Sequence, residues 1–132
     1  MDYTETCEYE CLYFVGFSGH WRQDLSLLEI PMQYIPSGIT FHGYLDLSGC
    51  EKLIYLPTNI VVYGFLDLSG CTTLSELSDG LCVGGDLDLS WCHSLKAIPP
   101  DIKVGEDVLA YYCSMKNISI KPKGVKGKVY VD

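Results

Sequence analysis

Apolar and polar positions recur with a fixed period between residues 43 and 105. This stretch reads GYLDLSGCEKLIYLPTNIVVY, GFLDLSGCTTLSELSDGLCVG and GDLDLSWCHSLKAIPPDIKVG, three consecutive copies of a 21-residue unit. The shared skeleton is G-x-L-D-L-S-x-C-x-x-L-x-x-[LI]-P-x-x-[IL]-x-V-x, with Ser78 in place of the proline in the second copy. Tandem copies of this length predict a solenoid in which each copy forms one coil.

Each copy contains one predicted strand. The L-D-L segment alternates apolar and polar residues with period two, which predicts a half-buried strand with Leu45 and Leu47 pointing inward and Asp46 pointing outward. Copies in register then form a parallel sheet with strands about 4.8 Å apart. Pro57 and Pro99 exclude a regular helix just before them, so the return segment is predicted to be extended or 3₁₀.

The repeat weakens at both ends of the chain, which we interpret as one domain over 1–132. Residues 1–24 do not fit the unit and are predicted to form an N-terminal cap. Residues 25–118 are predicted to form four to five coils, of which 25–42 is degenerate, with Leu25 and Leu27 at the strand positions. Residues 119–132 are predicted to be a Lys-rich C-terminal cap or tail with a closing strand or hairpin.

The cysteines follow the same period. Four of the seven, Cys50, Cys71, Cys92 and Cys113, are spaced by 21 residues, which predicts a column of buried thiols in place of a disulfide framework. Cys7, Cys11 and His20 lack a fourth ligand and the usual close spacing of a zinc site. We therefore expect no metal and no cofactor.

Charge is distributed unevenly along the chain. Residues 1–110 contain 16 Asp and Glu against 4 Lys and Arg, whereas residues 111–132 contain 5 Lys against 1 Asp. An acidic body repels phosphate backbones and attracts basic surfaces, so we expect a protein partner and no nucleic acid bound by the repeats. No apolar run is long enough to cross a bilayer, and the acidic N-terminus lacks the features of a signal peptide. We expect a cytoplasmic protein, or one inside a host cell if it is a secreted effector or a phage protein.

The unit L-x-L-S-x-C-x-x-L-x-x-L-P resembles leucine-rich repeats over roughly residues 25–118. The wording LDLSGC-x-x-L-x-x-LP is similar to repeats of plant immune receptors, and the 21-residue length with its P-x-x-I-x-V return resembles the short repeats of bacterial and phage proteins. The resemblance implies a leucine-rich-repeat solenoid, mostly β, whose parallel sheet is concave and binds ligands. Bacterial effectors of this kind often carry a separate ligase domain, and we expect none here.

The outward positions of the predicted sheet supply the candidate binding residues. The acidic ones either serve solubility and hydrogen bonding within the repeat or form a patch for a basic partner. A metal site is a weaker alternative, because single carboxylates in a row do not converge on one ion. Trp91 and Tyr112 replace Gly49 and Gly70 of the earlier copies, and they either stack on each other or act as binding hot spots. The predicted partner-binding residues are Tyr44, Asp46, Phe65, Asp67, Asp86, Asp88, Trp91, Asp107, Tyr111 and Tyr112.

Catalysis is not expected. Cys92 and His93 are adjacent, but neighbouring side chains usually point apart, and the chain has no Walker or Rossmann glycine loop. We expect a non-enzymatic interaction module, an inhibitor or effector that binds a basic surface of a host protein through an acidic and aromatic concave face. The alternative is a structural repeat protein that self-associates as a homo-oligomer, since both ends of a short solenoid expose sheet edges.

Overall fold

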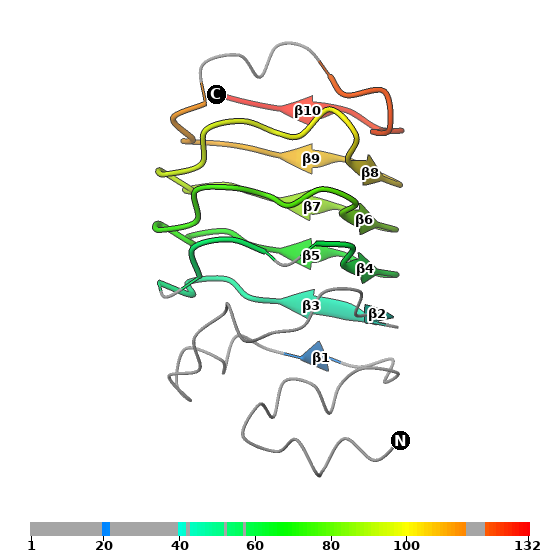
Figure 1. Cartoon of the computed structure of the whole chain (residues 1–132). Coiled ribbons are helices and arrows are strands. Elements are labelled where there is room, and N and C mark those ends of the chain that lie inside the picture. The colour runs from blue at the N-terminus through cyan, green and yellow to red at the C-terminus, as the bar shows by residue number, and fades with distance from the viewer. Residues whose placement is uncertain (1–19, 22–39, 42, 52, 57, 116–120) are drawn as a thin grey trace, which may run out of the picture.

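The chain winds into a parallel β-solenoid, seen in a computed structural model that describes residues 20–21, 40–41, 43–51, 53–56, 58–115 and 121–132 (Figure 1). Its strands stack in parallel, one above another, as each coil follows the last. The strands are β1 (His20–Trp21), β2 (Thr40–Phe41), β3 (Tyr44–Asp46), β4 (Val61–Val62), β5 (Leu66–Asp67), β6 (Cys82–Val83), β7 (Leu87–Asp88), β8 (Lys103–Val104), β9 (Val108–Leu109) and β10 (Val129–Tyr130).

Two parallel sheets make up the solenoid. One has six strands in the order β1-β3-β5-β7-β9-β10, and the other has four in the order β2-β4-β6-β8. The larger sheet is the one predicted from the L-D-L segments: Leu45 pairs with Leu66, and Leu66 pairs with Leu87. This offset of 21 residues confirms that each copy of the unit forms one coil.

The return segments combine turns with short extended strands, which agrees with the extended one of the two predicted conformations, and the described residues include no α- or 3₁₀-helix. Their valines form the second sheet, which was not predicted: Val62 pairs with Val83, and Val83 with Val104. No helix in the described part of the chain has the length and apolar character needed to cross a membrane.

The core fills the space between the two sheets. Each clean copy buries the strand leucines, the column cysteine, the next leucine of the unit, and the Ile or Leu and the Val of its [IL]-x-V segment. Because the same positions recur in every coil, each side chain packs on its equivalents above and below. The completely or almost completely buried residues include Leu47, Leu53, Leu66, Leu68, Leu74, Leu81, Leu87, Leu89, Leu95, Ile102, Val62 and Val83.

The six-stranded sheet begins earlier than the repeat pattern indicates. β1 lies inside the segment 1–24 that was predicted as a cap, and its Trp21 pairs with Leu45 of β3. The predicted strand positions Leu25 and Leu27 lie outside the described residues.

The C-terminal segment also continues the solenoid. Val125 forms a parallel bridge with Val104, and Val129 of β10 pairs with Val108 of β9. Both pairs are 21 residues apart. Residues 121–132 therefore follow the register of the repeats, and β10 is the closing strand that was predicted as one of two possibilities for this segment.

Candidate functional site

The ten predicted binding residues all lie on the six-stranded sheet or next to it in the chain. Asp46 pairs in register with Asp67, Asp67 with Asp88, and Asp88 with Leu109. The same column ends at Tyr130, which pairs with Leu109. The neighbouring columns carry the other predicted residues, so one outward face joins the acidic and the aromatic positions.

The aspartates of this column close the turn that follows each strand. Asp46 Oδ1 accepts hydrogen bonds from the Ser48 amide at 3.0 Å and from the Ser48 hydroxyl at 2.6 Å. Asp67 Oδ1 accepts the same two bonds from Ser69, at 2.9 and 2.6 Å. Side chains of this kind that bond the backbone two residues on are typical of Asx turns. The L-D-L-S motif therefore has a structural role within its own coil.

The third copy varies this arrangement. Asp88 Oδ1 accepts the Ser90 amide at 2.9 Å, but the Ser90 hydroxyl instead accepts a bond from the Tyr111 amide of the next coil at 3.3 Å. Ser90 is buried as a result of its place between coils.

Electrostatic repulsion and burial act together on Asp67, the central member of the row. Burial raises the pKa of the Asp67 carboxyl above its ordinary value, and the charges of Asp88 and Asp46 raise it further, whereas the two hydrogen bonds from Ser69 lower the pKa. A positive charge placed against this row would relieve that repulsion.

The column at the start of the strands changes character from one end to the other. The rings of Tyr44 and Phe65 stack with centroids 4.4 Å apart. In the following coils, Asp86 Oδ1 accepts the Asp107 amide at 2.9 Å, and Asp107 Oδ1 accepts the Lys128 amide at 2.8 Å. These two carboxylates thus tie successive coils together as well as adding charge to the face.

Trp91 and Tyr112 occupy a backbone conformation that favours glycine. Their φ angles are 64° and 59°, and the equivalent Gly49 and Gly70 have φ of 74° and 75°. Bulky residues in this left-handed region are rare and cost about 1 kcal/mol or more. The two rings stack with centroids 4.3 Å apart, yet the side chains remain 50% and 51% exposed.

A second pair of rings, Tyr111 and Tyr130, lies in the coil of Tyr112 and the next one, and the four residues Trp91, Tyr111, Tyr112 and Tyr130 are called the aromatic patch below. The Tyr111 and Tyr130 rings lie 6.4 Å apart, and both side chains are exposed. Tyr130 was not predicted, although continuing the 21-residue period from Leu109 places it in the column.

His93 and Asp132 are also neighbours of the patch that were not predicted. The His93 ring meets Trp91 edge-on at 5.9 Å, and Asp132 Oδ1 accepts the Tyr112 amide at 3.1 Å. His93 is exposed whereas Cys92 is fully buried, so the two side chains face opposite sides of the coil. Among the described residues, no group of three or more His, Cys, Asp or Glu is arranged to hold a metal ion.

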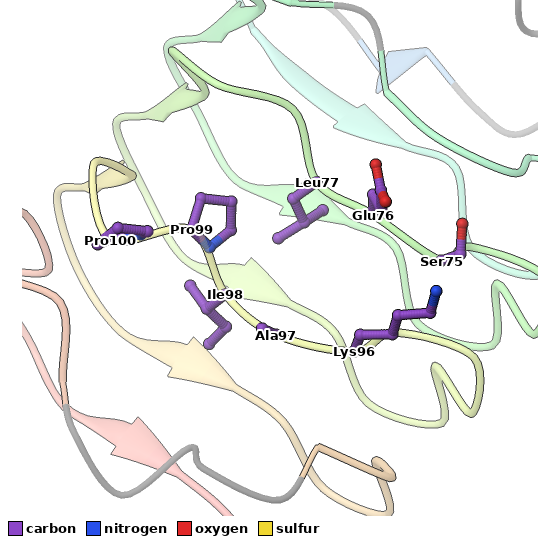
Figure 2. Close-up of a pocket in the computed structure, with 8 residues that line it drawn as sticks. All are labelled: Ser75, Glu76, Leu77, Lys96, Ala97, Ile98, Pro99 and Pro100. Carbon is purple, nitrogen blue, oxygen red and sulfur yellow. The ribbon is translucent and has the colours of Figure 1, made fainter.

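A pocket of about 260 Å³ lies between the return segments of the second and third copies of the 21-residue unit (Figure 2). Tyr55 and Glu76 form a parallel bridge beside it. In Figure 2 the aliphatic side chains lie toward one end of the pocket, and Lys96 and Glu76 lie toward the other. None of its lining residues belongs to the predicted face. They are Ser75, Glu76, Leu77, Lys96, Ala97, Ile98, Pro99 and Pro100.

Comparisons with known proteins found no match for this chain among protein-family models, curated proteins or solved structures. The fold and the face define a parallel β-solenoid repeat protein whose larger sheet presents a row of carboxylates next to exposed aromatic rings.

Proposed function

We propose that this chain is a non-enzymatic protein-interaction module that binds a basic surface of another protein through its acidic and aromatic face. The observation that carries the proposal is the pair Trp91 and Tyr112. Each is half exposed and held in a strained turn position that glycine fills in two other coils. Residues that cost stability and remain exposed point to a role in binding.

The acidic row next to the patch supports the choice of a basic partner. Asp46, Asp67 and Asp88 lie in consecutive strands. In each carboxylate only Oδ1 is engaged within the described chain, by the serine two residues on. The remaining oxygens add negative potential to one face, which steers a positively charged partner toward it.

We further propose that this β-solenoid is of the leucine-rich-repeat type. It rests on the LDLSGC-x-x-L-x-x-LP motif and on the 21-residue register that pairs Leu45 with Leu66 and Leu66 with Leu87. By the same resemblance we propose an inhibitor or effector of bacterial or phage type that acts on a host protein inside the cell.

The test is affinity purification with charge-neutralised variants. Asp46→Asn, Asp67→Asn and Asp88→Asn together remove three charges but keep the side-chain oxygen that closes each turn. A matched control, Glu76→Gln with Asp79→Asn and Asp101→Asn, removes three charges from the return side. Both variants are used with the wild-type chain to recover partners from lysate of the source organism or its host, with mass spectrometry as the readout.

The proposal requires that one partner with a basic surface binds the wild-type and control chains and is lost with the face variant. Equal recovery of that partner by all three chains would show that binding does not involve this face. Circular dichroism confirms that each variant is folded.

Self-association is the second candidate function. β10 is the last strand of the six-stranded sheet, so its outer edge has no partner strand in the described chain. Such an edge is a template for pairing with another chain. A constant monomeric mass in light scattering across a wide range of concentrations would exclude this function.

A further inference from the structure

The two faces of the Trp91 ring have different surroundings. One face packs on Tyr112 of the next coil. In the preceding coil the equivalent residue is Gly70, and before it Gly49, so no side chain from this column covers the other face. A Cβ at Gly49 would contact nothing within 4 Å, and a Cβ at Gly70 would approach only Gly49, at 3.6 Å. Within this column, Trp91 is therefore followed toward the N-terminus by two positions without side chains, and the His93 ring meets the indole edge-on at 5.9 Å.

The column itself is well defined by hydrogen bonds between coils. The Gly49 amide bonds the Ser69 carbonyl at 2.8 Å, the Gly70 amide bonds the Ser90 carbonyl at 2.8 Å, and the Trp91 amide bonds the Tyr111 carbonyl at 2.9 Å. The ladder therefore continues from the sheet into the turns. Gly70 and Trp91 therefore lie in adjacent coils that backbone hydrogen bonds hold in register.

Asp67 and Asp88 belong to the same turns as Gly70 and Trp91. Asp67 is three residues before Gly70, and Asp88 is three residues before Trp91. Their Oδ1 atoms are fixed by the turn serines, which leaves Oδ2 without a hydrogen bond from the described chain. Asp67 is partly buried and lies in register between the like charges of Asp46 and Asp88, so a cation is the complementary group.

Resting on the proposed function, we propose that the Gly70-facing side of Trp91, with Asp67 and Asp88, binds an arginine side chain of the partner. A guanidinium is planar and stacks on an indole face, and its fork of donors suits a carboxylate at the same time. A lysine ammonium would meet the same charge without the planar stacking. Nucleic acid is excluded by the same carboxylates, because they repel phosphate.

The experiment uses NMR of the ¹⁵N-labelled full chain with three acetylated, amidated peptides of equal length. Each has four residues of arginine, lysine or neutral citrulline, separated by glycine. The Trp91 indole signal is identified by its absence in Trp91→Gly. This variant keeps the turn, because glycine has the same conformation at Gly49 and Gly70. Tyr55→Thr removes an exposed aromatic ring from the return side and serves as the matched control.

We expect the arginine peptide to shift the Trp91 indole and Gly70 amide signals and to bind about two- to fivefold more tightly than the lysine peptide. The citrulline peptide should produce no shift. Trp91→Gly should remove the preference for arginine over lysine, whereas Tyr55→Thr should retain it.

Three outcomes would overturn the arginine site: equal affinity for the arginine and lysine peptides, an unchanged preference in Trp91→Gly, or no shift of the Trp91 and Gly70 signals. The same experiments distinguish failure of the arginine site from failure of the proposed function. If the triple Asn variant loses the natural partner while the peptides show no arginine preference, the interaction face stands and the arginine site falls. If the arginine peptide is preferred but the natural partner binds the triple variant normally, the arginine site stands and the proposed interaction face falls.

Discussion

The thiol of Cys92 donates a hydrogen bond to the carbonyl oxygen of Leu68 in the preceding coil, at 3.1 Å. The same carbonyl accepts the backbone amide of Cys71 at 3.1 Å. Both lone pairs of a buried carbonyl are therefore used, one within the coil and one between coils. Cys71 and Cys113 repeat the contact with Leu47 and Leu89 at 3.1 and 2.8 Å, so the cysteine column links successive coils through the core.

Removing this link should destabilise the fold. Cys92→Ala deletes a fully buried sulfur and one hydrogen bond, and the expected loss is about 1–3 kcal/mol in the free energy of unfolding. Urea denaturation followed by circular dichroism measures it. The control is Cys82→Ala, because Cys82 is half-buried and its thiol has no hydrogen bond within the described chain. An equal loss in both variants would contradict a specific role for the column.

The column thiols should resist alkylation in the folded protein. Burial raises the pKa of Cys92 to about 12 and also raises the pKa values of Cys71 and Cys113. Since the thiolate is the reactive form, Cys71 and Cys92 should be modified by iodoacetamide at pH 8 only after denaturation. Among the five cysteines that the structure describes, the partly exposed Cys82 should react first. Peptide mapping by mass spectrometry after short exposure measures the order, and early modification of Cys92 would contradict its burial.

Neutralising Asp67 should stabilise the chain at neutral pH. Its pKa is raised by folding, so the folded state holds a proton that the unfolded chain has already lost, and stability falls as pH rises through this range. Asp67→Asn should therefore have a higher melting temperature than wild type at pH 7. The advantage should vanish below the ordinary carboxyl pKa of 3.8, where Asp67 is protonated in both states. Differential scanning calorimetry at both pH values measures this.

The exposed Asp79 provides the control for that experiment. Asp79→Asn should change the melting temperature little at either pH. A lower melting temperature for Asp67→Asn than for wild type at pH 7 would contradict this. It would show that the hydrogen bonds of the charged carboxylate stabilise the fold by more than burial of the charge destabilises it.

The 21-residue period was enough to predict the larger sheet, but the second sheet and the last coil were not predicted. Alternation within L-D-L was enough to predict the larger sheet and its buried leucines. The second sheet was missed because the [IL]-x-V segments that contain its strands, such as Val61–Val62, were interpreted only as part of an extended or 3₁₀ return. Val129 and Tyr130 were not placed in a further coil because their segment has neither the L-D-L strand nor the column cysteine.

For the candidate face, the period predicts which residues are neighbours but not the hydrogen bonds of the turns that carry them. Trp91 and Tyr112 occupy equivalent positions of consecutive copies, so the 21-residue period alone predicts that they are neighbours. The glycines at the same position carried the additional signal, since recurrent glycine at a turn favours positive φ. The hydrogen bonds from Ser48 and Ser69 to the aspartates depend on the local turn geometry, which the period alone does not specify.

Substitution by alanine should reduce the stability of the fold much more at Gly84 than at Gly49. At Gly84 a Cβ would collide with the carbonyl oxygen of Tyr63 in the preceding coil, and because the contacted atoms are backbone they cannot rotate away as a side chain would. At Gly49 a Cβ meets no atom within 4 Å, so alanine there incurs only the penalty of a positive φ. We expect Gly49→Ala to cost about 1 kcal/mol and Gly84→Ala more than about 3 kcal/mol.

Urea denaturation of both variants, with the yield of soluble protein as a second readout, measures this difference. Side chains occur in both columns, Trp91 and Tyr112 in that of Gly49 and Tyr63 and Lys126 in that of Gly84, so the difference rests on the local backbone. At Gly84 the collision with the Tyr63 carbonyl would force adjacent coils apart along the solenoid axis. Because every coil packs on its neighbours, separation at one level also breaks the hydrogen bond from the Gly84 amide to the Val62 carbonyl, at 2.8 Å. If Gly84→Ala were as stable as Gly49→Ala, the close approach of the coils at this corner would not limit the stability of the solenoid.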